Sequence, residues 1–170
     1  MSKMYVNELL PKDAARVAIP GHAIQVQQGI LTTQTESSAA TGTTVDINLY
    51  VSITPTYTNS KIRITLGSLS VRSRSPDTFG ILFLERSING GSYTRIVSFA
   101  EYFGSSTTYG TQEVYPTLDY IDTPSTTSSL SYRITGYRVS GSANIAYHHN
   151  FNGGSGVYNK ATLTATEIAQ

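Results

Sequence analysis

One stretch of strict alternation constrains the fold of this chain more than any other feature of the sequence. From Val45 to Ile53 every odd position is apolar, and the even positions are mostly polar. Successive side chains of a β-strand point to opposite faces, so this period of two predicts an antiparallel strand with one face on a core. The alternation recurs over 62–66 and then changes parity, which predicts a β-bulge near Gly67.

The remaining segments extend this pattern to the whole chain. Phe79 to Leu84 is apolar on both faces, which is typical of a central or an interface strand, and the Asn-Gly pair at 89–90 predicts a hairpin turn. Ser and Thr make up 44 of the 170 residues and are interleaved with apolar positions, so they belong to strands and turns rather than to disorder. Further strands are expected at 24–31, 93–99, 112–121, 129–140, 143–151 and 157–168. The expected fold class is therefore all-β: an antiparallel β-sandwich of jelly-roll type with a short N-terminal arm.

The length of the chain and its first residues predict one globular domain preceded by an arm. A chain of 170 residues supports a single core. The first 22 residues are interrupted by prolines and lack the strand alternation. Their apolar residues, which we expect to dock on a neighbouring chain, are Tyr5, Val6, Leu9 and Leu10. The predicted organisation is a docking arm over 1–22 and a β-sandwich domain over 23–170.

The charge and cysteine content exclude several classes of function. Charged residues are only 14% of the chain and the formal net charge is +1, whereas a protein that binds phosphate backbones needs a basic face. There is no cysteine, which excludes disulfides, thiolate metal sites and a cysteine nucleophile. No stretch approaches the roughly 18 apolar residues of a membrane span. We therefore expect no nucleic-acid partner and no membrane insertion.

Few residues could support catalysis or bind a metal. His148 and His149 are adjacent, and adjacent strand residues point to opposite faces, so we expect an exposed pair at a strand end rather than a metal site. Asp119 and Asp122 could form a glycosidase carboxylate pair, but the Asp-Thr-Pro sequence at 122–124 indicates a turn that opens with an Asx-type hydrogen bond. No G-x-S-x-G occurs. We expect that the chain is not an enzyme and that it has no catalytic residue, no metal and no cofactor.

The arginines on the predicted strands allow two interpretations. In the first, they face solvent and pair across strands with Glu85, Glu101 or Glu113 of the same chain. In the second, they form ion pairs between subunits around a symmetry axis.

Two groups of apolar side chains are candidates for contacts with partners. The segment from 100 to 112 carries Tyr102, Phe103 and Tyr109 amid Gly, Ser and Thr, a composition typical of loops that contact sugars or proteins, and equally of rings that cover a subunit seam. The candidate subunit interface is the apolar strand, with Phe79, Ile81 and Phe83.

Several segments, taken in order, resemble a module of phage virion and tail-fibre-like proteins, notably those of cyanophages and other aquatic phages. The match includes a strand, an Arg and a glycine turn over 83–94. The other matching segments are 18–25 (AIPGHAIQ), 48–55 (NLYVSITP), 60–64 (SKIRI), 122–132 (DTPSTTSSLSY) and 160–168 (KATLTATEI). The resemblance covers almost the whole chain, and it carries no catalytic residues.

The resemblance implies a non-enzymatic bacteriophage virion structural protein. The expected molecule is a homotrimeric surface knob that acts as a short fibre or as a capsid decoration or cement protein, located on the virion after assembly in the host cytoplasm. Its expected partners are copies of itself and other capsid or tail proteins, with a host surface glycan or protein as a further candidate. The alternative is a lectin-like, carbohydrate-binding module for receptor recognition. A hydrolytic spike enzyme acting through Asp119 or Asp122 ranks last.

Overall fold

The structure is a computed structural model that describes residues 19–73, 78–103, 113–141, 144–148 and 160–170, with only the backbone of Tyr102 and Phe103. Within these residues the chain forms twelve strands and no helix. The strands are β1 (Ala23–Leu31), β2 (Thr35–Ser37), β3 (Thr44–Ile53), β4 (Lys61–Gly67), β5 (Val71–Ser73), β6 (Phe79–Ile88), β7 (Thr94–Phe103), β8 (Glu113–Val114), β9 (Leu118–Asp122), β10 (Leu130–Ser140), β11 (Ile145–Tyr147) and β12 (Ala161–Ile168). None of the described segments is a helix with the length and apolar character needed to cross a membrane.

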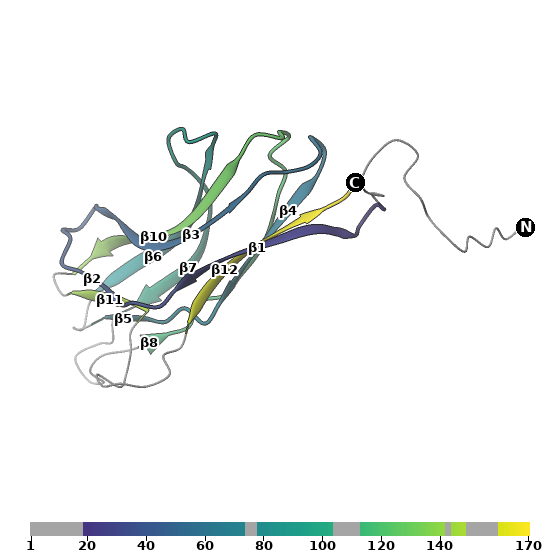
Figure 1. The fold of residues 1–170 in the computed structure, drawn as a ribbon. Helices are drawn as coiled ribbons and strands as arrows, with labels where there is room; N and C mark the ends of the chain where they lie inside the picture. Colours follow the sequence, from purple (N-terminus) through teal and green to yellow (C-terminus); the bar gives the residue numbers. More distant parts are fainter. Residues whose placement is uncertain (1–18, 74–77, 104–112, 142–143, 149–159) are drawn as a thin grey trace, which may run out of the picture.

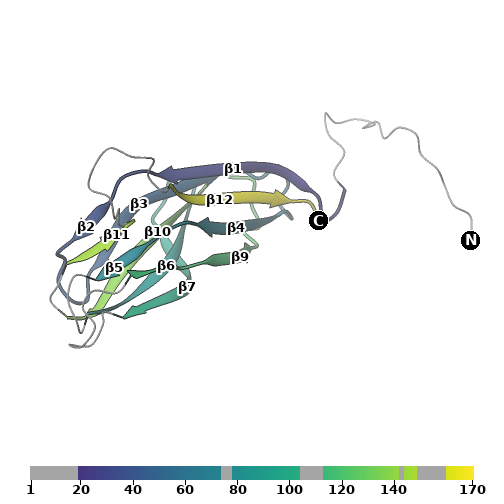
Figure 2. The ribbon, with the colours of Figure 1, turned by 90° about the horizontal axis from the view of Figure 1, so that it is seen from below.

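Two four-stranded antiparallel sheets form the body of the molecule. The first, called the β1 sheet below, has the strand order β1-β12-β4-β9, and the second, called the β10 sheet, has the order β3-β10-β6-β7. A third, small sheet with the order β2-β11-β5-β8 lies at one end, where the short strands gather (Figure 1). Figure 2 shows the four strands of the β1 sheet side by side in their order.

The connections between the two large sheets are those of a jelly roll. Along the chain the strands alternate between the sheets, except at the β6–β7 hairpin, which stays within the β10 sheet. The first strand β1 and the last strand β12 are antiparallel neighbours. This arrangement of eight strands in two sheets is the double Greek key of jelly rolls. The predicted fold class, an antiparallel β-sandwich of jelly-roll type, is confirmed.

The core lies between the two large sheets and follows the alternation of the sequence. On β3 the buried positions are 47, 49, 51 and 53, and on β12 they are 161, 163, 165 and 167. The largest fully buried side chains are those of Tyr132, Tyr147, Ile47, Leu49, Ile62, Ile64, Leu69, Leu82, Leu84, Leu130 and Ile134. The period of two therefore identified which side of β3 and of β4 faces the core.

The predicted hairpin at 89–90 is confirmed in detail. Asn89 has φ +50° and Gly90 has φ +72°, and two successive positive φ values are the mark of the type I′ turn that suits the twist of hairpin strands. The turn connects strand β6 to strand β7.

Other expectations were wrong in their boundaries. The parity change near Gly67 is no bulge: β4 ends there, Ser68 takes φ +56°, and the chain continues as β5 in the small sheet. The single strand expected over 112–121 is two strands, β8 and β9, separated by a segment that contains Pro116, which has no N–H to donate to a ladder. Strand β2 had no counterpart in the prediction.

Candidate interaction surfaces

The most deeply buried acid of the sandwich is Glu167, on the inner face of β12. Its carboxylate has no exposure to solvent and accepts five hydrogen bonds. Oε1 accepts from the backbone N–H of Thr56 at 2.7 Å and from the hydroxyl of Ser60 at 2.7 Å. Oε2 accepts from Nε2 of Gln25 at 2.7 Å. These bonds attach β1 and the turn between β3 and β4 to the last strand of the chain.

The hydrogen bonds decide the ionisation of Glu167. Burial by itself raises the pKa of this carboxyl group, but the donors from Ser60, Gln25 and Thr56 outweigh it and lower the pKa below its ordinary value. Glu167 is therefore a carboxylate at neutral pH, with its oxygens occupied by donors of its own chain. It serves as an anchor of the fold.

A second carboxylate, Asp122 on the inner face of β9, links the two large sheets. Nη1 of Arg86 on β6 donates to both carboxylate oxygens at 2.7 Å, and the hydroxyl of Tyr132 on β10 donates to Oδ2 at 2.7 Å. Burial raises the pKa of Tyr132, and the hydrogen bond to Asp122 raises it further. The expected Asx-type hydrogen bond at 122–124 is thus replaced by a bridge across the sandwich.

Asp119 lies on the opposite face of β9 from Asp122, because it pairs with Thr65 while Asp122 pairs with Ile62. Nε and Nη2 of Arg63 donate to its two oxygens at 2.8 and 2.6 Å. This hydrogen bonding lowers the pKa of Asp119. Two carboxylates on opposite faces of a strand cannot flank one glycosidic bond, so the geometry gives no support to a glycosidase pair.

The outer face of the β10 sheet carries a network of acids and arginines. Glu85 on β6 is only 7% exposed in its side chain and lies between two arginines of neighbouring strands. Arg133 donates from Nε to Oε2 of Glu85 at 2.9 Å and from Nη1 to Asp46 at 2.8 Å. Nε of Arg95 lies 3.4 Å from Oε1 of Glu85. The hydroxyl of Tyr50 donates to Asp46 and completes the network.

Aromatic rings lie beneath these guanidinium groups. The guanidinium carbon of Arg95 is 4.1 Å from the centre of the Phe83 ring, and that of Arg133 is 3.9 Å from the centre of the Tyr93 ring. The rings of Phe83 and Tyr137 meet edge to face, with centres 6.2 Å apart. Cation–π and edge-to-face contacts of this kind stabilise the face from within one chain.

The ion pairs of the described residues lie within one chain, and pairs between subunits stay a prediction. Arg95 and Arg133 pair with Glu85, as the first interpretation expects. Further ion pairs join Arg63 to Asp119, Arg86 to Asp122 and Arg133 to Asp46, partners that the sequence did not single out. Arg86 departs from the first interpretation, because it points inward between the sheets instead of facing solvent.

The residues of the candidate subunit interface share this outer face. Phe79, Ile81 and Phe83 alternate along β6 and are each half-buried, while the intervening Leu82 and Leu84 lie in the core. Whether another chain covers them stays a prediction.

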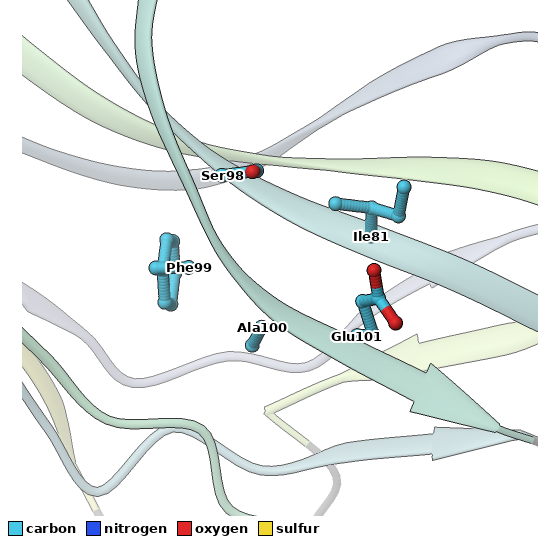
Figure 3. Close-up of a pocket in the computed structure, with 5 residues that line it drawn as sticks. All are labelled: Ile81, Ser98, Phe99, Ala100 and Glu101. Carbon is cyan, nitrogen blue, oxygen red and sulfur yellow. The ribbon is translucent and has the colours of Figure 1, made fainter.

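A shallow hollow of ≈ 250 Å³ lies beside these residues on β6 and β7 (Figure 3). Its lining consists of Ile81, Ser98, Phe99, Ala100 and Glu101. The register of the β6–β7 pair shifts at this point, so that Phe99 forms a bulge on an edge strand. The lining contains one carboxylate and no second acid or base that could act with it. The hollow has the character of a surface contact rather than of a catalytic site.

The outer face of the β1 sheet is different in kind. Thr162, Thr164 and Thr166 alternate along its second strand, β12, and are half-buried. Beside them on β1, Val26 is 57% exposed and Ile30 is 51% exposed. Ile121 on β9, at the other edge of the sheet, is also exposed. Large aliphatic side chains are therefore exposed to solvent on this face, beside the hydroxyl groups of the β12 threonines.

Several predicted site residues lie outside the described residues. The residues of the docking arm, Tyr5, Val6, Leu9 and Leu10, are among them, as are Tyr109 and His149. For Tyr102 and Phe103 the structure places only the backbone, at the end of the edge strand β7.

The expectation of an exposed histidine pair was wrong for His148. Its side chain is buried, its backbone takes φ +55°, and its N–H donates to the carbonyl of Ser70 at 2.6 Å. This left-handed residue follows β11 directly, so the strand alternation used for the prediction does not extend to it. Among the described residues, no group of three or more His, Cys, Asp or Glu side chains could hold a metal ion.

The sequence contained a signal for the Glu167 anchor that was not used. The inner face of β12 is formed by Ala161, Leu163, Ala165 and Glu167, so the acid continues an otherwise apolar series at core parity. A carboxylate at such a position must find donors inside the protein.

No protein-family model and no curated protein matches the chain. Among solved structures it is similar to a chain of the infectious bursal disease virus Gx strain, at 17% identity and a TM-score of 0.40, covering 96% of this chain and 42% of that chain. It is also similar to the VP2 subviral particle of that virus, at 16% identity and a TM-score of 0.40, covering 96% and 42%. For the T13 particle of the virus the values are 14% and 0.42, covering 98% and 40%. The chain thus spans less than half the length of these viral chains.

Proposed function

We propose that this chain is a non-enzymatic structural protein of a bacteriophage particle, a trimeric surface knob that serves as a short fibre or as a capsid decoration protein. The observation that carries the proposal is the place in the fold of the segments that resemble the phage virion module. Three of them supply Gln25, Ser60 and Glu167, which meet in one buried cluster. Two others supply Arg86, Asp122 and Tyr132, which form the bridge between the sheets. Residues of the module-like segments therefore stabilise the contacts between strands and between sheets.

The state of the acidic side chains supports a role without catalysis. Glu85, Asp119, Asp122 and Glu167 are each engaged with donors of their own chain. A catalytic acid or base needs a proton position that a substrate can reach, and these carboxylates are committed to arginines and backbone groups instead.

The shape of the molecule supports assembly with other chains. Jelly rolls are common in viral capsid and lectin domains, where their flat outer faces make contacts. A chain without cysteines gains stability on a particle by burying further apolar area against its neighbours. Phe79, Ile81 and Phe83 on the β10 sheet remain our candidates for the trimer contact.

The proposal is tested on the protein and on the particle together. Sedimentation velocity should give a mass three times the 18.4 kDa of one chain, and mass spectrometry should detect the protein in purified particles. A monomer that is absent from particles would reject the proposal. Particles that lack the protein separate the two forms of the role: loss of adsorption indicates a fibre, and fragile heads indicate a decoration protein.

The second candidate function is carbohydrate binding. It is favoured by the aromatic rings of Tyr93 and Tyr137 on the outer face of the β10 sheet, together with the backbone position of Tyr102 and Phe103 on its edge strand. It predicts that the purified protein binds a glycan and that Tyr93→Ala weakens the binding. A glycan array without signal would leave only the structural role.

A further inference from the structure

Strand β1 is an edge strand with exposed aliphatic side chains. Only its β12 side is paired within the sheet, so its other edge carries backbone groups without a strand partner. Val26 and Ile30 stand on its outer face at 57% and 51% exposure. The residues between and beside them are uncharged, with Gln28 on β1 and Thr164 on β12. The surface formed by the outer face and the open edge of β1 is called the β1 ridge below.

The inner side of β1 is closed at Gly29. A Cβ atom on Gly29 would lie 1.6 Å from the carbonyl oxygen of Tyr50, so the backbones of β1 and β3 are in direct contact there. Between Val26 and Ile30 a partner can therefore approach β1 along the ridge but not past Gly29 on the inner side.

The arm joins the sandwich at the start of the ridge. The N–H of Gly21 donates to the carbonyl of Ala169 at 2.9 Å, and the N–H of Ala169 donates to the carbonyl of His22 at 3.0 Å. These bonds hold the beginning of β1 at the end of the molecule where the C-terminus lies (Figures 1 and 2). The preceding 18 residues can span at most about 60 Å, which exceeds the roughly 30 Å of a nine-residue strand.

We propose that residues 1–18 of one copy dock along the β1 ridge of a neighbouring copy, where Tyr5, Val6, Leu9 and Leu10 cover Val26 and Ile30. The chemistry of the two partners matches, because the sequence of the arm and the surface of the ridge both carry aliphatic side chains. An extended segment can also pair its backbone with the open edge of β1. This inference rests on the proposed assembly of several copies and adds a second contact between them, beside the one proposed for Phe79, Ile81 and Phe83 on the β10 sheet.

The turn at the start of β1 favours an arm that comes from another copy. The N–H of His22 donates to the carbonyl of Ile19 at 3.0 Å, which closes a tight turn. If the arm folded back on its own β1 as a hairpin through this turn, Val26 would face Ala15 and Ile30 would face Pro11. Leu10 would then reach only the last residue of β1, Leu31, and residues 5 to 9 would lie beyond it. In that hairpin the apolar residues of the arm do not cover Val26 and Ile30, whereas the arm of a neighbour can take a register that covers both.

The absence of cysteine makes a cross-linking experiment direct. Two full-length variants with tags of different size, Leu9→Cys and Ile30→Cys, are expressed together and oxidised. We expect a disulfide-linked species that contains one chain of each kind. The matched control pairs Leu9→Cys with Ser92→Cys, an exposed position in the turn between β6 and β7, and should give about tenfold less of the mixed species. Equal yields would overturn the proposal. So would a double variant, with Leu9→Cys and Ile30→Cys in one chain, whose disulfide forms only within that chain.

A second measurement does not depend on cross-linking. The double substitution Val26→Asp and Ile30→Asp should weaken self-association about tenfold or more in sedimentation velocity, because the ridge loses its apolar partners. The melting temperature of the separated chains should stay unchanged, since both side chains are exposed. Ser92→Asp, at an exposed position in the turn between β6 and β7, is the control and should leave association unaltered. If the protein forms trimers on particles and none of these variants changes association, the proposal that the arm docks on the ridge is wrong and the proposed function stands. A monomer in every condition rejects both.

Discussion

The two large sheets place their buried carboxylates on opposite sides. The β1 sheet turns Glu167 and Asp122 inward, where they join strands and bridge the sandwich. The β10 sheet turns Glu85 outward and covers it with Arg95, Arg133 and aromatic rings. The hydrogen bonds of the buried acids therefore lie inside the sandwich for the β1 sheet and on the outer face for the β10 sheet.

This difference decides which surface remains available to a partner. A buried charge requires donors close by, and side chains that supply them are no longer free to contact another molecule. On the β10 sheet Arg95 and Arg133 are occupied with the rings beneath them, whereas Ile81 of the candidate interface lines the open hollow. The β1 sheet satisfies its buried acids in the interior, and its outer face carries the exposed side chains of Val26, Ile30 and Ile121. Substitutions on the two sheets test this difference.

The largest effect is expected for the inner anchor. Glu167→Ala removes the acceptor of five hydrogen bonds and leaves donors from Gln25, Thr56 and Ser60 buried without it. We expect the free energy of unfolding to fall by about 4 kcal/mol, since hydrogen bonds to a charged group are the stronger ones. Urea denaturation measures this. A loss below about 1 kcal/mol would contradict the role of Glu167 as an anchor.

The same anchor should make the sandwich sensitive to acid. The pKa of Glu167 is lower in the folded chain than in the unfolded chain, so its contribution to stability is complete above the unfolded value of about 4.3 and is lost as the pH falls through the folded value. Glu167→Gln, which cannot ionise, should lose stability less steeply over this range. Melting curves between neutral and acid pH, recorded for both proteins, provide the measurement, and parallel curves would disprove the linkage.

A smaller effect is expected for the outer anchor. Glu85→Ala leaves Arg133 and Arg95 without their common acid, but the Arg95 side chain is 43% exposed and gains water in compensation. We expect a loss of about 2 kcal/mol in unfolding free energy, about half that of Glu167→Ala. If Glu85→Ala and Glu167→Ala lowered the free energy of unfolding equally, the two networks would contribute equally to stability, and the proposed difference between the sheets would be wrong.

Removing one neutral hydrogen-bond donor from the bridge between the sheets should lower the free energy of unfolding by a small amount. Tyr132→Phe removes the hydroxyl that donates to Asp122, while Arg86 continues to hold that carboxylate. We expect a loss of about 1–2 kcal/mol in the free energy of unfolding, with the sandwich intact by circular dichroism. Phe in place of Tyr93, whose hydroxyl lies at the partly open surface beside Ser131, is the control and should cost less.

The smallest effect is expected on the outer face of the β1 sheet. Asp119→Asn breaks the ion pair with Arg63, but both side chains stand in water. Exposed pairs of this kind contribute little, so the melting temperature should not change detectably. A clear destabilisation would mean that this face is more strongly ordered than the exposure of its side chains indicates.

Much of the fold could be predicted from local features of the sequence. The period of two identified the core positions of β3 and β4, and Asn89-Gly90 identified the hairpin from its tolerance of positive φ. The path after Gly67 could not be predicted, because a change of sheet and a bulge alter the parity in the same way. The position of His148 could not be predicted either, because its backbone N–H donates to the carbonyl of Ser70, which is distant in sequence.

The candidate surfaces were less predictable than the strands. Phe79, Ile81 and Phe83 were recognised as one face of a strand, and the structure places them together. The exposed Val26 and Ile30 were not singled out, because alternation alone does not distinguish an aliphatic residue in the core from one on the outer face of the same sheet.

Local sequence patterns and composition were sufficient for most of the long strands, the inner faces of β3 and β4, the hairpin and the absence of cysteine chemistry, because each of these depends on neighbouring residues or on residue content. The tertiary structure alone decided where the acids find their partners. Glu167 meets Ser60 and Gln25 across more than 100 residues of chain, and Asp122 meets Arg86 from the opposite sheet. Such pairings follow from strand order and register, which bring together side chains that no local pattern relates, and they determine which face of the sandwich is left for other molecules.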